Sequence, residues 1–292
     1  MIFVTGGTGF IGKPLVERLA RCHKIRCLVR SASRSKIAPN PAVEIVERDL
    51  LSSAIPKESL DGVETVIHLA ALLRSAKASD IYRVNVTGTR LLVDACKKNG
   101  VRRFIFLSTE NALREDLRDA YPESKRQAER IVKELENFLI LRPCFVYGPG
   151  DTHGLGKLAD LARQWPFAPL FGGLKSKIQP IHIQDMVECL TRAVFSEISG
   201  EYLLAGPESI SINDFIKKTL KARRLDKPPV PLPYPFYFLA AKFCDIFLPE
   251  IGWGSPQLMN IYRSRTYSIE KTVKDFGYAP RGINEGLKLE NP

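Results

Sequence analysis

The sequence VTGGTGFIG at residues 4–12 decides the fold. It overlaps the apolar run Ile2-Phe3-Val4 and leads into a helical pattern at 13–20. From Gly7 onward the spacing is G-x-G-x-x-G, which permits a tight turn, a close approach of backbone to a pyrophosphate and close packing of helix on strand. The first amides and the dipole of the helix can then bind phosphates. We therefore predict a dinucleotide site formed by Gly6, Gly7, Thr8, Gly9, Phe10, Ile11 and Gly12.

Apolar runs and helical patterns alternate along the first half of the chain. Further strands are expected at 25–29, 44–47, 65–70, 103–108, 138–142, 178–183 and 201–205. Helices are expected at about 81–99, after Pro122 and at about 184–195. The alternation predicts an α/β fold, a Rossmann-type doubly wound parallel sheet with a smaller C-terminal substrate-binding lobe. We expect the dinucleotide-binding core at 1–148 and mostly the substrate lobe at 149–292, with segments near 178–205 returning to the core.

The composition narrows the class of protein. With 45% hydrophobic residues among 292, the chain can bury a large core, and it has no run of eighteen apolar residues that would span a membrane. Because the fingerprint stands at the start, no signal peptide is expected. The six cysteines form no C-x-x-C pair, which favours reduced thiols in a cytoplasmic protein. Nothing near His68 or His182 suggests a metal, and both are expected to be packed or hydrogen-bonded.

The net charge of the chain is +11. The basic residues are spread along the sequence, and the small clusters look like solvated helix ends. This distribution favours attraction of an anionic cofactor or substrate, and no nucleic-acid partner is expected.

The sequence Tyr121-Pro122-Glu123-Ser124-Lys125 is the second motif that carries chemistry. Residues four apart lie on one face of a helix, and the proline suits a first turn. A free phenol has a pKa near 10, and a nearby ammonium lowers it. The pair is therefore a candidate proton donor and acceptor at a carbonyl or carbinol. By itself, the Tyr-x-x-x-Lys spacing also occurs on surfaces without any function.

Together the two motifs resemble the short-chain dehydrogenase/reductase superfamily, in its extended or atypical branch. That branch includes nucleotide-sugar epimerases and dehydratases, 3β-hydroxysteroid dehydrogenases and relatives of the NADPH-binding accessory subunit of respiratory complex I. The resemblance covers nearly the whole chain. It also rests on the stretches Asp49-Leu50, 68–71, 85–89, 107–109, Arg142-Pro143, 146–151 and 181–185.

The resemblance implies roles for the matching positions. Tyr121 would be the general acid/base, and Lys125 would bind the nicotinamide ribose and tune that tyrosine. A hydroxyl after the fifth strand would hydrogen-bond the substrate oxygen, with Thr109 the first choice and Ser108 the second, unless Ser108 is tied to backbone. Asp49 would meet the adenine amino group or cap the next helix. The other cofactor contacts that the resemblance implies are Leu50, Leu69, Ala70, Ala71, Pro143 and Val146.

The residue after the second strand predicts the cofactor. NAD sites usually place Asp or Glu about twenty residues beyond the glycines, where it binds the ribose 2′-hydroxyl. This chain has Arg30 there, followed by Ser31, Ser33, Arg34 and Lys36. A guanidinium can bind a 2′-phosphate with two hydrogen bonds, whereas a carboxylate repels it. We therefore predict NADP(H) as the preferred cofactor, with NAD(H) as the second option.

The leading functional hypothesis is an NAD(P)-dependent oxidoreductase or epimerase that transfers hydride at an alcohol or ketone carbon. The resemblance makes a nucleotide sugar the first substrate class. However, Thr109 and Tyr121 are only twelve residues apart, where sugar-modifying relatives carry a longer insertion, and Pro122 resembles the steroid dehydrogenases. A lipophilic sterol- or quinone-like substrate is therefore one alternative. A non-catalytic NADPH-binding accessory or redox-sensing protein is another.

The C-terminal half is less regular. Residues 149–180 are rich in Gly and Pro and are expected to form loops over the site. The prolines of 228–235 predict a stiff extended run, and the apolar stretch at 236–248 predicts a helix packed on the substrate lobe. The alternative for 236–248 is an exposed apolar face that contacts a membrane surface or lines a lipophilic pocket. We expect a monomer or homodimer that binds a small-molecule substrate.

Overall fold

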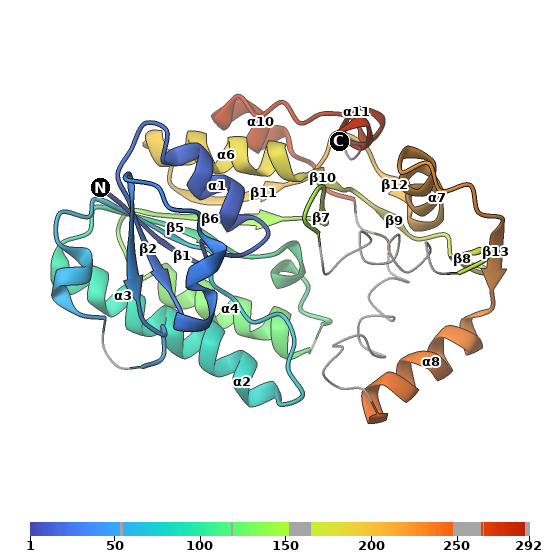
Figure 1. The fold of residues 1–292 in the computed structure, drawn as a ribbon, viewed down its shortest axis with the longest axis horizontal. Helices are drawn as coiled ribbons and strands as arrows, with labels where there is room; N and C mark the ends of the chain where they lie inside the picture. Colours follow the sequence, from blue (N-terminus) through green and yellow to red (C-terminus); the bar gives the residue numbers. More distant parts are fainter. Residues whose placement is uncertain (53–54, 118, 152–164, 248–263, 265, 290–292) are drawn as a thin grey trace. The chain divides into compact units, whose positions relative to one another are not determined.

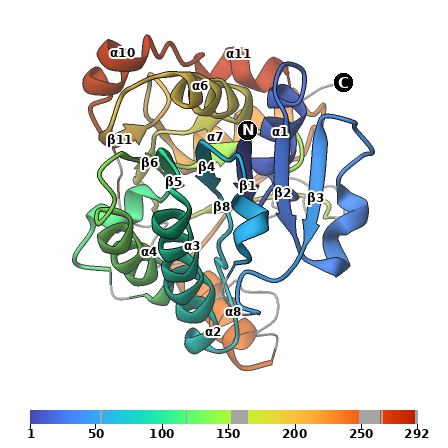
Figure 2. The same cartoon turned by 90° about the vertical axis from the view of Figure 1, so that its left-hand side faces the viewer.

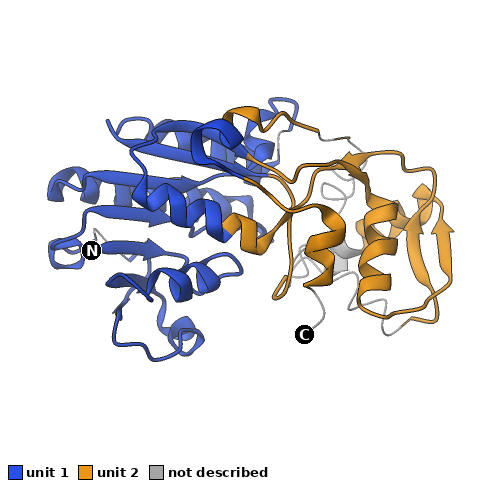
Figure 3. Ribbon diagram, turned by 90° about the horizontal axis from the view of Figure 1, so that it is seen from above, with its two compact units in different colours: residues 1–143, 187–203, 272–278 blue, residues 144–186, 204–271, 279–292 orange. Residues whose placement is uncertain are grey.

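The computed structural model describes residues 1–52, 55–117, 119–151, 165–247, 264 and 266–289, except for the side chains of 244–247. The chain divides into two compact units (Figure 3). Unit 1 contains residues 1–143, 187–203 and 272–278, and unit 2 contains 144–186, 204–271 and 279–292. Each unit is therefore assembled from three separate stretches of chain.

Unit 1 is built on a seven-stranded sheet in the order β11-β6-β5-β4-β1-β2-β3 (Figures 1 and 2). Its strands are β1 (Ile2–Thr5), β2 (Ile25–Val29), β3 (Val43–Glu47), β4 (Thr65–His68), β5 (Arg103–Leu107), β6 (Phe138–Pro143) and β11 (Gly200–Leu204). From β3 to β6 every neighbouring pair is parallel, with Ile2 opposite both Ile25 and Thr65. The central strands β1, β4 and β5 are fully buried, which explains their almost continuous apolar sequences. The predicted Rossmann-type sheet is confirmed.

Helices cover both faces of this sheet (Figure 1). α1 (Gly12–Leu19) and α6 (Ile183–Phe195) lie on one face, and α3 (Gly88–Asn99) and α4 (Ala120–Val132) lie on the other. One buried cluster joins the sheet to α3 and α4 and includes Phe104 and Phe106. Shorter elements of the described chain are η1 (Ser31–Lys36), η2 (Lys57–Leu60), α2 (Ala78–Tyr82), η4 (Glu110–Leu113) and α10 (Glu270–Phe276).

The helix expected at 81–99 is interrupted. α2 ends at Tyr82, the five residues of η3 (Arg83–Thr87) form a π-turn, and α3 follows. At the centre of this turn, Asn85 accepts a hydrogen bond from the Leu72 amide at 2.7 Å and donates one to the Leu72 carbonyl at 3.0 Å. A π-turn contains one residue more than a regular helical turn. Here the turn contains Asn85, which holds the loop after β4 through its two hydrogen bonds to Leu72. Apolar periodicity does not reveal such an insertion.

Unit 2 consists of short strand pairs and helices. Parallel pairs join β7 (Val146–Tyr147) to β10 (Ile181–His182) and β8 (Ala168–Phe171) to β13 (Pro229–Leu232), and an antiparallel pair joins β9 (Lys177–Ile178) to β12 (Ile210–Ser211). The helices described in this unit are α7 (Ile212–Ala222), α8 (Tyr234–Phe247) and α11 (Ile283–Lys288). Phe171 and Phe215 lie in its apolar core.

Two expectations for unit 2 need correction. The range 149–180 contains the strands β8 and β9 in addition to loops, and its residues 152–164 lie outside the described part. The extended run expected at 228–235 ends early, because α8 begins at Tyr234. Pro235 fits there because a proline is tolerated in the first turn of a helix.

The expectations about thiols, metals and membrane spans can be compared with the described residues. The side chains of Cys27, Cys96 and Cys189 are buried, and burial raises the pKa of each thiol to about 12. These thiols therefore stay protonated and act as packing residues. Within the described residues, no group of three or more His, Cys, Asp or Glu side chains could hold a metal ion. None of the helices searched there is long and apolar enough to cross a membrane.

Candidate active site

The loop after β1 packs tightly on the loop after β4. Gly6 has a φ of +75°, where a side chain would be strained, and a Cβ there would lie 2.6 Å from the backbone nitrogen of Ala70. A Cβ at Gly12 would lie 2.1 Å from the carbonyl oxygen of Gly6. These two glycines therefore allow the start of α1 and both loops to meet beside β1, between β2 and β4, where the strand order reverses. In open parallel sheets, ligands bind at such a reversal.

The start of α1 fits a bound pyrophosphate. Lys13 donates its amide to the carbonyl of Gly9 at 2.9 Å, which begins the helical bonding pattern. The amides of Phe10, Ile11 and Gly12 donate no backbone hydrogen bond within the described residues. The first turn of α1 contains no acidic residue. Free amides at a helix N-terminus bind phosphate, so this turn can hold the dinucleotide.

The remaining predicted loop residues differ in exposure. Gly7 is buried, and a Cβ there would lie 3.2 Å from Val16. Gly9 is exposed, and Thr8, Phe10 and Ile11 are partly exposed. The outer side of the turn is therefore accessible to a ligand, while its inner side packs on α1.

Two predicted residues lie after the outer strands. Arg30 follows β2, is exposed and has no side-chain partner within the described part of the chain. Arg34, by contrast, is paired with Glu47 at 2.9 Å. Asp49 accepts the amide of Leu51 at 2.8 Å, so its carboxylate closes its own turn. Arg30 is thus the arginine of this segment that can bind a 2′-phosphate without first breaking an ion pair.

Leu50 holds the turn at Asp49 in place. Its side chain is buried and packs on Gly88 of α3, where a Cβ would lie 2.7 Å from Leu50 Cδ2. A side chain at Gly88 would displace the leucine. The predicted adenine-binding turn is therefore anchored by packing on a helix.

Tyr121 and Lys125 lie near the start of α4. Lys125 is 2% exposed, and its Nζ donates to the carbonyl of Leu107, the last residue of β5, at 2.6 Å. The same nitrogen lies 4.2 Å from the centroid of the Phe106 ring. Burial lowers the pKa of Lys125 to about 7, against the opposing attraction of Glu129. The amine is therefore fixed at the carboxyl end of β5 and titrates near neutral pH.

The pKa of Tyr121 is raised, although the sequence predicted a lowered value. Burial is the larger cause, and the nearby carboxylate of Glu110 adds to it. The ammonium of Lys125, which was expected to lower this pKa, is held by the Leu107 carbonyl. Tyr121 is therefore protonated at neutral pH, which is the form that donates a proton.

The two candidate hydroxyls after β5 have different surroundings. Ser108 is buried and donates to Oε1 of Glu129 at 2.5 Å. Thr109 accepts the amide of Asn111 at 3.3 Å and thereby caps η4. The Thr109 hydroxyl hydrogen has no acceptor in the described residues and can be donated to a ligand. The Ser108 hydroxyl therefore donates to a carboxylate, whereas the alternative considered from the sequence was a backbone partner.

Comparisons with known proteins identify the family. The model of the NAD dependent epimerase/dehydratase family matches residues 2–203. The chain belongs to this family. It is an extended short-chain dehydrogenase/reductase, and hence an NAD(P)-dependent oxidoreductase or epimerase.

Named relatives include reductases and dehydrogenases. A ceramide reductase from Caulobacter vibrioides is 35% identical over 187 residues, which covers 63% of this chain and 58% of that protein. A 3 beta-hydroxysteroid dehydrogenase/Delta 5→4-isomerase from Mycobacterium tuberculosis is 24% identical over 96% of this chain and 86% of its own length. The structure of a UDP-glucuronic acid 4-epimerase from Bacillus cereus, with UDP-glucuronic acid and NAD, has a TM-score of 0.76 at 21% identity, covering 99% of this chain and 97% of the other. At that identity the similarity is one of fold.

Asn85 links two parts of this epimerase/dehydratase-family site, although no role was predicted for it. Besides holding Leu72, it donates to Oγ of Ser124 at 2.9 Å, and that hydroxyl donates to the carbonyl of Tyr121 at 2.7 Å. The loop after β4 is therefore connected to the backbone of the tyrosine. The stretch at 85–89 matched the family pattern, but an asparagine in a helical pattern does not by itself indicate an anchor.

His68 forms the centre of a buried chain of hydrogen bonds. The Thr89 hydroxyl donates to the carbonyl of Asn85 at 2.6 Å, so it accepts from His68 Nε2 at 3.0 Å. Nδ1 of the histidine is then the acceptor for the Thr5 hydroxyl at 2.6 Å, and Thr5 accepts the Ala70 amide at 3.3 Å. Burial, and then Lys125, lower the pKa of His68 to about 3. The histidine is therefore neutral and structural, in agreement with the expectation from sequence.

A buried ion pair supports the end of β5. Arg142 binds Glu129 through two hydrogen bonds, at 2.8 and 2.6 Å, and also contacts Glu201. Glu129 in turn accepts the Ser108 hydroxyl. Arg142 belonged to a stretch that matched the family, whereas Glu129 had no signal beyond its place in a helical pattern. The pair therefore positions the Ser108 hydroxyl.

The connection between η4 and α4 is held by Arg126. Its guanidinium donates to the carbonyls of Arg114 and Leu117 at 2.7 and 2.6 Å, and it also binds Glu123. Arg126 of α4 therefore holds the short span between Thr109 and Tyr121 in place.

The other predicted cofactor contacts are distributed over both units. Leu69, Ala70 and Ala71 follow β4 and are partly buried. Pro143 ends β6 in unit 1, and Val146 begins β7 in unit 2. Their contacts with a cofactor remain predictions.

Proposed function

We propose that this chain is an NADPH-dependent reductase of a ketone carried by a lipophilic molecule. The observation that carries the proposal is the position of Tyr121 in the first turn of α4, one turn before Lys125, whose amine is fixed on the Leu107 carbonyl at the end of β5. The pKa of Tyr121 is raised, so the phenol is a proton donor at neutral pH. When bound, a reduced nicotinamide would supply hydride to a carbonyl carbon, and Tyr121 is positioned to give the proton to the carbonyl oxygen. A protonated tyrosine therefore suits reduction better than oxidation.

The chain's own residues divide the work at the substrate oxygen. Tyr121 Oη donates the proton, and the Thr109 hydroxyl donates a hydrogen bond to the same oxygen, because its hydrogen has no other acceptor in the described residues. Lys125, with a pKa of about 7, binds the nicotinamide ribose in this proposal, the role that the family resemblance implies. The Leu107 carbonyl holds that amine in position.

Unit 1 supplies the cofactor site in this proposal. The amides at the start of α1 bind the pyrophosphate, and Arg30 binds the 2′-phosphate of NADPH. Asp49 meets the adenine amino group. The part of the chain after Gly148 that belongs to unit 2 binds the substrate, as the sequence predicted.

Two observations support a lipophilic substrate over a nucleotide sugar. The ceramide reductase and the steroid dehydrogenase carry names of lipophilic substrates, and the latter aligns over nearly all of this chain. Thr109 and Tyr121 are only twelve residues apart, without the longer insertion of sugar-modifying relatives, and Arg126 ties this span to α4 through Arg114 and Leu117. The epimerase that binds UDP-glucuronic acid shares the fold at 21% identity, which does not transfer its substrate.

The proposal is tested by assaying NADPH oxidation with two panels of substrates. One panel contains ketones that carry a long alkyl chain or a sterol ring system, and the other contains UDP-sugars. We expect turnover with members of the first panel and formation of the alcohol in amounts equal to the NADPH consumed. Interconversion of UDP-sugars without net consumption of cofactor would contradict the proposal and favour an epimerase.

A further inference from the structure

Helix α8 exposes large apolar side chains. Leu239 is 72% exposed, Phe236 55% and Phe243 53%. Tyr234 and Phe238 are more than one third exposed as well. From Tyr234 to Phe243 the sequence has one charged residue, Lys242. A group of aromatic and aliphatic side chains of this size on one helix marks an interaction surface.

Within the described residues, two side chains of α8 pack against the apolar core of unit 2 and form a narrow seam. Tyr237 and Ala241 pack against the apolar core, with the Tyr237 ring 4.4 Å from Phe171 and its hydroxyl donating to the Leu170 carbonyl at 3.1 Å. These residues are four apart and form one stripe. At 100° per residue, Phe236, Leu239 and Phe243 lie on the opposite side of the helix. The packed-helix interpretation from sequence therefore describes the seam, whereas Phe236 and Leu239 are exposed.

The apolar surface continues around the helix. Between the seam and its opposite side lie Pro235, Phe238 and Ala240, with Lys242 as the polar exception. A helix that is apolar all round is normally buried. A groove on a partner protein would cover one face, whereas the surface layer of a lipid bilayer surrounds an inserted helix on every side except its attached seam. The pattern therefore favours a bilayer as the occupant.

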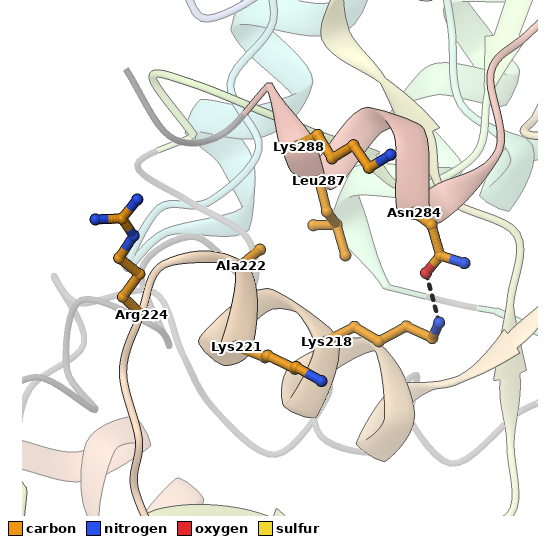
Figure 4. Close-up of a pocket in the computed structure, with 7 residues that line it drawn as sticks. All are labelled: Lys218, Lys221, Ala222, Arg224, Asn284, Leu287 and Lys288. Atoms are coloured by element: carbon orange, nitrogen blue, oxygen red, sulfur yellow. Dashed lines mark hydrogen bonds between the residues drawn. The ribbon is translucent and has the colours of Figure 1, made fainter.

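The charge of the adjoining chain is complementary to an anionic bilayer. Between residues 217 and 242 there is one acidic residue, Asp226, and the basic ones are Lys217, Lys218, Lys221, Arg223, Arg224, Lys227 and Lys242. Lys217 pairs with Asp214 at 3.8 Å, and the next acidic residue along the chain, Asp245, belongs to α8. A groove of about 490 Å³ between α7 and α11 is lined by three of them together with Lys288, and by no carboxylate (Figure 4). Groups of basic residues of this size attract anionic lipids.

We propose that α8 is a docking helix, which inserts its apolar side chains into the interfacial layer of an anionic bilayer while the basic residues of 217–242 supply electrostatic attraction. This proposal does not depend on the identity of the substrate. If the substrate is lipophilic, the same contact would bring the protein to the phase in which that substrate dissolves.

The test is co-sedimentation of the full chain with vesicles of phosphatidylcholine alone or mixed with phosphatidylglycerol. We expect binding to the mixed vesicles and weaker binding to the neutral ones. The double variant Phe236→Ser/Leu239→Ser should reduce binding to mixed vesicles by on the order of tenfold or more. The double variant Lys221→Gln/Arg224→Gln should reduce the preference for the anionic lipid by on the order of 25-fold, at roughly fivefold per charge near the surface.

Val273→Ser is the matched control, because Val273 is an exposed apolar residue (42%) on α10. It should bind vesicles like the parent. Equal melting temperatures for all variants establish that folding is intact. Failure of the parent to bind either vesicle would overturn the proposal, as would equal binding by the Phe236→Ser/Leu239→Ser variant. Concentration-dependent dimerisation abolished by that same variant would instead assign the face to a second copy of this chain.

Discussion

Lys125 is the residue in which stability and function oppose one another most directly. Its ammonium group is 2% exposed, and burial lowers its pKa to about 7. Below pH 7 the amine is charged in both folded and unfolded chains, and the folded chain bears the full cost of burying that charge. Between pH 7 and the unfolded pKa near 10.5 the folded chain holds fewer protons, so this cost declines as pH rises.

Replacing Lys125 by Met should therefore stabilise the protein and remove its activity. At pH 6.5 we expect a gain of about 1–3 kcal/mol in the free energy of unfolding, after the loss of the hydrogen bond to Leu107. The gain should shrink between pH 7 and pH 10. Denaturant unfolding of parent and variant across this range measures it. A gain that does not change with pH would contradict the assigned pKa.

Arg30 determines the cofactor in our account. Arg30→Asp should raise the Kd of NADPH by on the order of a hundredfold, because a carboxylate then repels the 2′-phosphate. The Kd of NADH should change little. Arg21→Asp is the control, since it makes the same charge change at another exposed position. Fluorescence titration gives all of these constants, and an unchanged Kd for NADPH in Arg30→Asp would refute the assignment.

At the scale of elements, the glycine loop and α1 depend on the close contact at Gly12. Gly12→Ala would place a Cβ 2.1 Å from a backbone oxygen that has no room to move, so we expect a loss of several kcal/mol or no folded protein, and no cofactor binding. Gly100→Ala is the matched variant. Gly100 ends α3 at a φ of +64° with nothing within 4 Å of a Cβ, so only the backbone strain of about 1 kcal/mol applies.

Thermal unfolding and cofactor titration of both variants separate the two effects. The account requires Gly100→Ala to retain cofactor binding with a lowered Tm. Near-normal stability of Gly12→Ala would show that the loop is less tightly packed than described.

The elements also show which features a sequence can predict. The glycine spacing, the buried strands and the position of Tyr121 and Lys125 on one helix face follow from local patterns, and these were predicted. The π-turn at Asn85 could not be predicted, because its reason is a hydrogen bond to Leu72 in a different segment. The donation from Ser108 to Glu129 and the raised pKa of Tyr121 likewise depend on which groups the fold buries together.

At the scale of the whole molecule, two buried histidines should make the fold sensitive to acid. Burial is the main reason that the pKa of His68 falls to about 3 and that of His182 to about 4. An unfolded histidine binds a proton below about pH 6.5, whereas these two remain neutral in the fold. The free energy of unfolding should therefore fall by about 1.4 kcal/mol per pH unit for each histidine as the pH drops from 6.5 to 4.

Urea unfolding at a series of pH values measures this slope. His68→Asn should reduce the slope even though the variant is less stable at neutral pH. His23→Asn is the control, because His23 is exposed on the surface. A slope in the His68→Asn variant as steep as in the parent would mean that other groups cause the acid sensitivity.

The division into two units also marks the limit of the sequence-based account. The alternation of strands and helices predicted the parallel sheet of unit 1. The candidate catalytic and cofactor-binding residues could be placed at one edge of that sheet from their positions in the sequence. Unit 2 has only short strand pairs, and its most prominent feature, the exposed α8, could not be distinguished from a packed helix by its apolar sequence. Exposure depends on what the rest of the chain covers, as the 72% exposure of Leu239 shows.

The measurement that tests the central claim most directly is single-turnover hydride transfer from NADPH deuterated at the nicotinamide, compared between the parent and Tyr121→Phe. The account predicts that label appears on the carbon of the product alcohol with the parent. In Tyr121→Phe the rate should fall by about 10²–10⁴, the usual contribution of a positioned proton donor, while the Kd of NADPH stays the same. Hydride transfer at the parental rate in Tyr121→Phe, with cofactor bound equally well, would contradict the account.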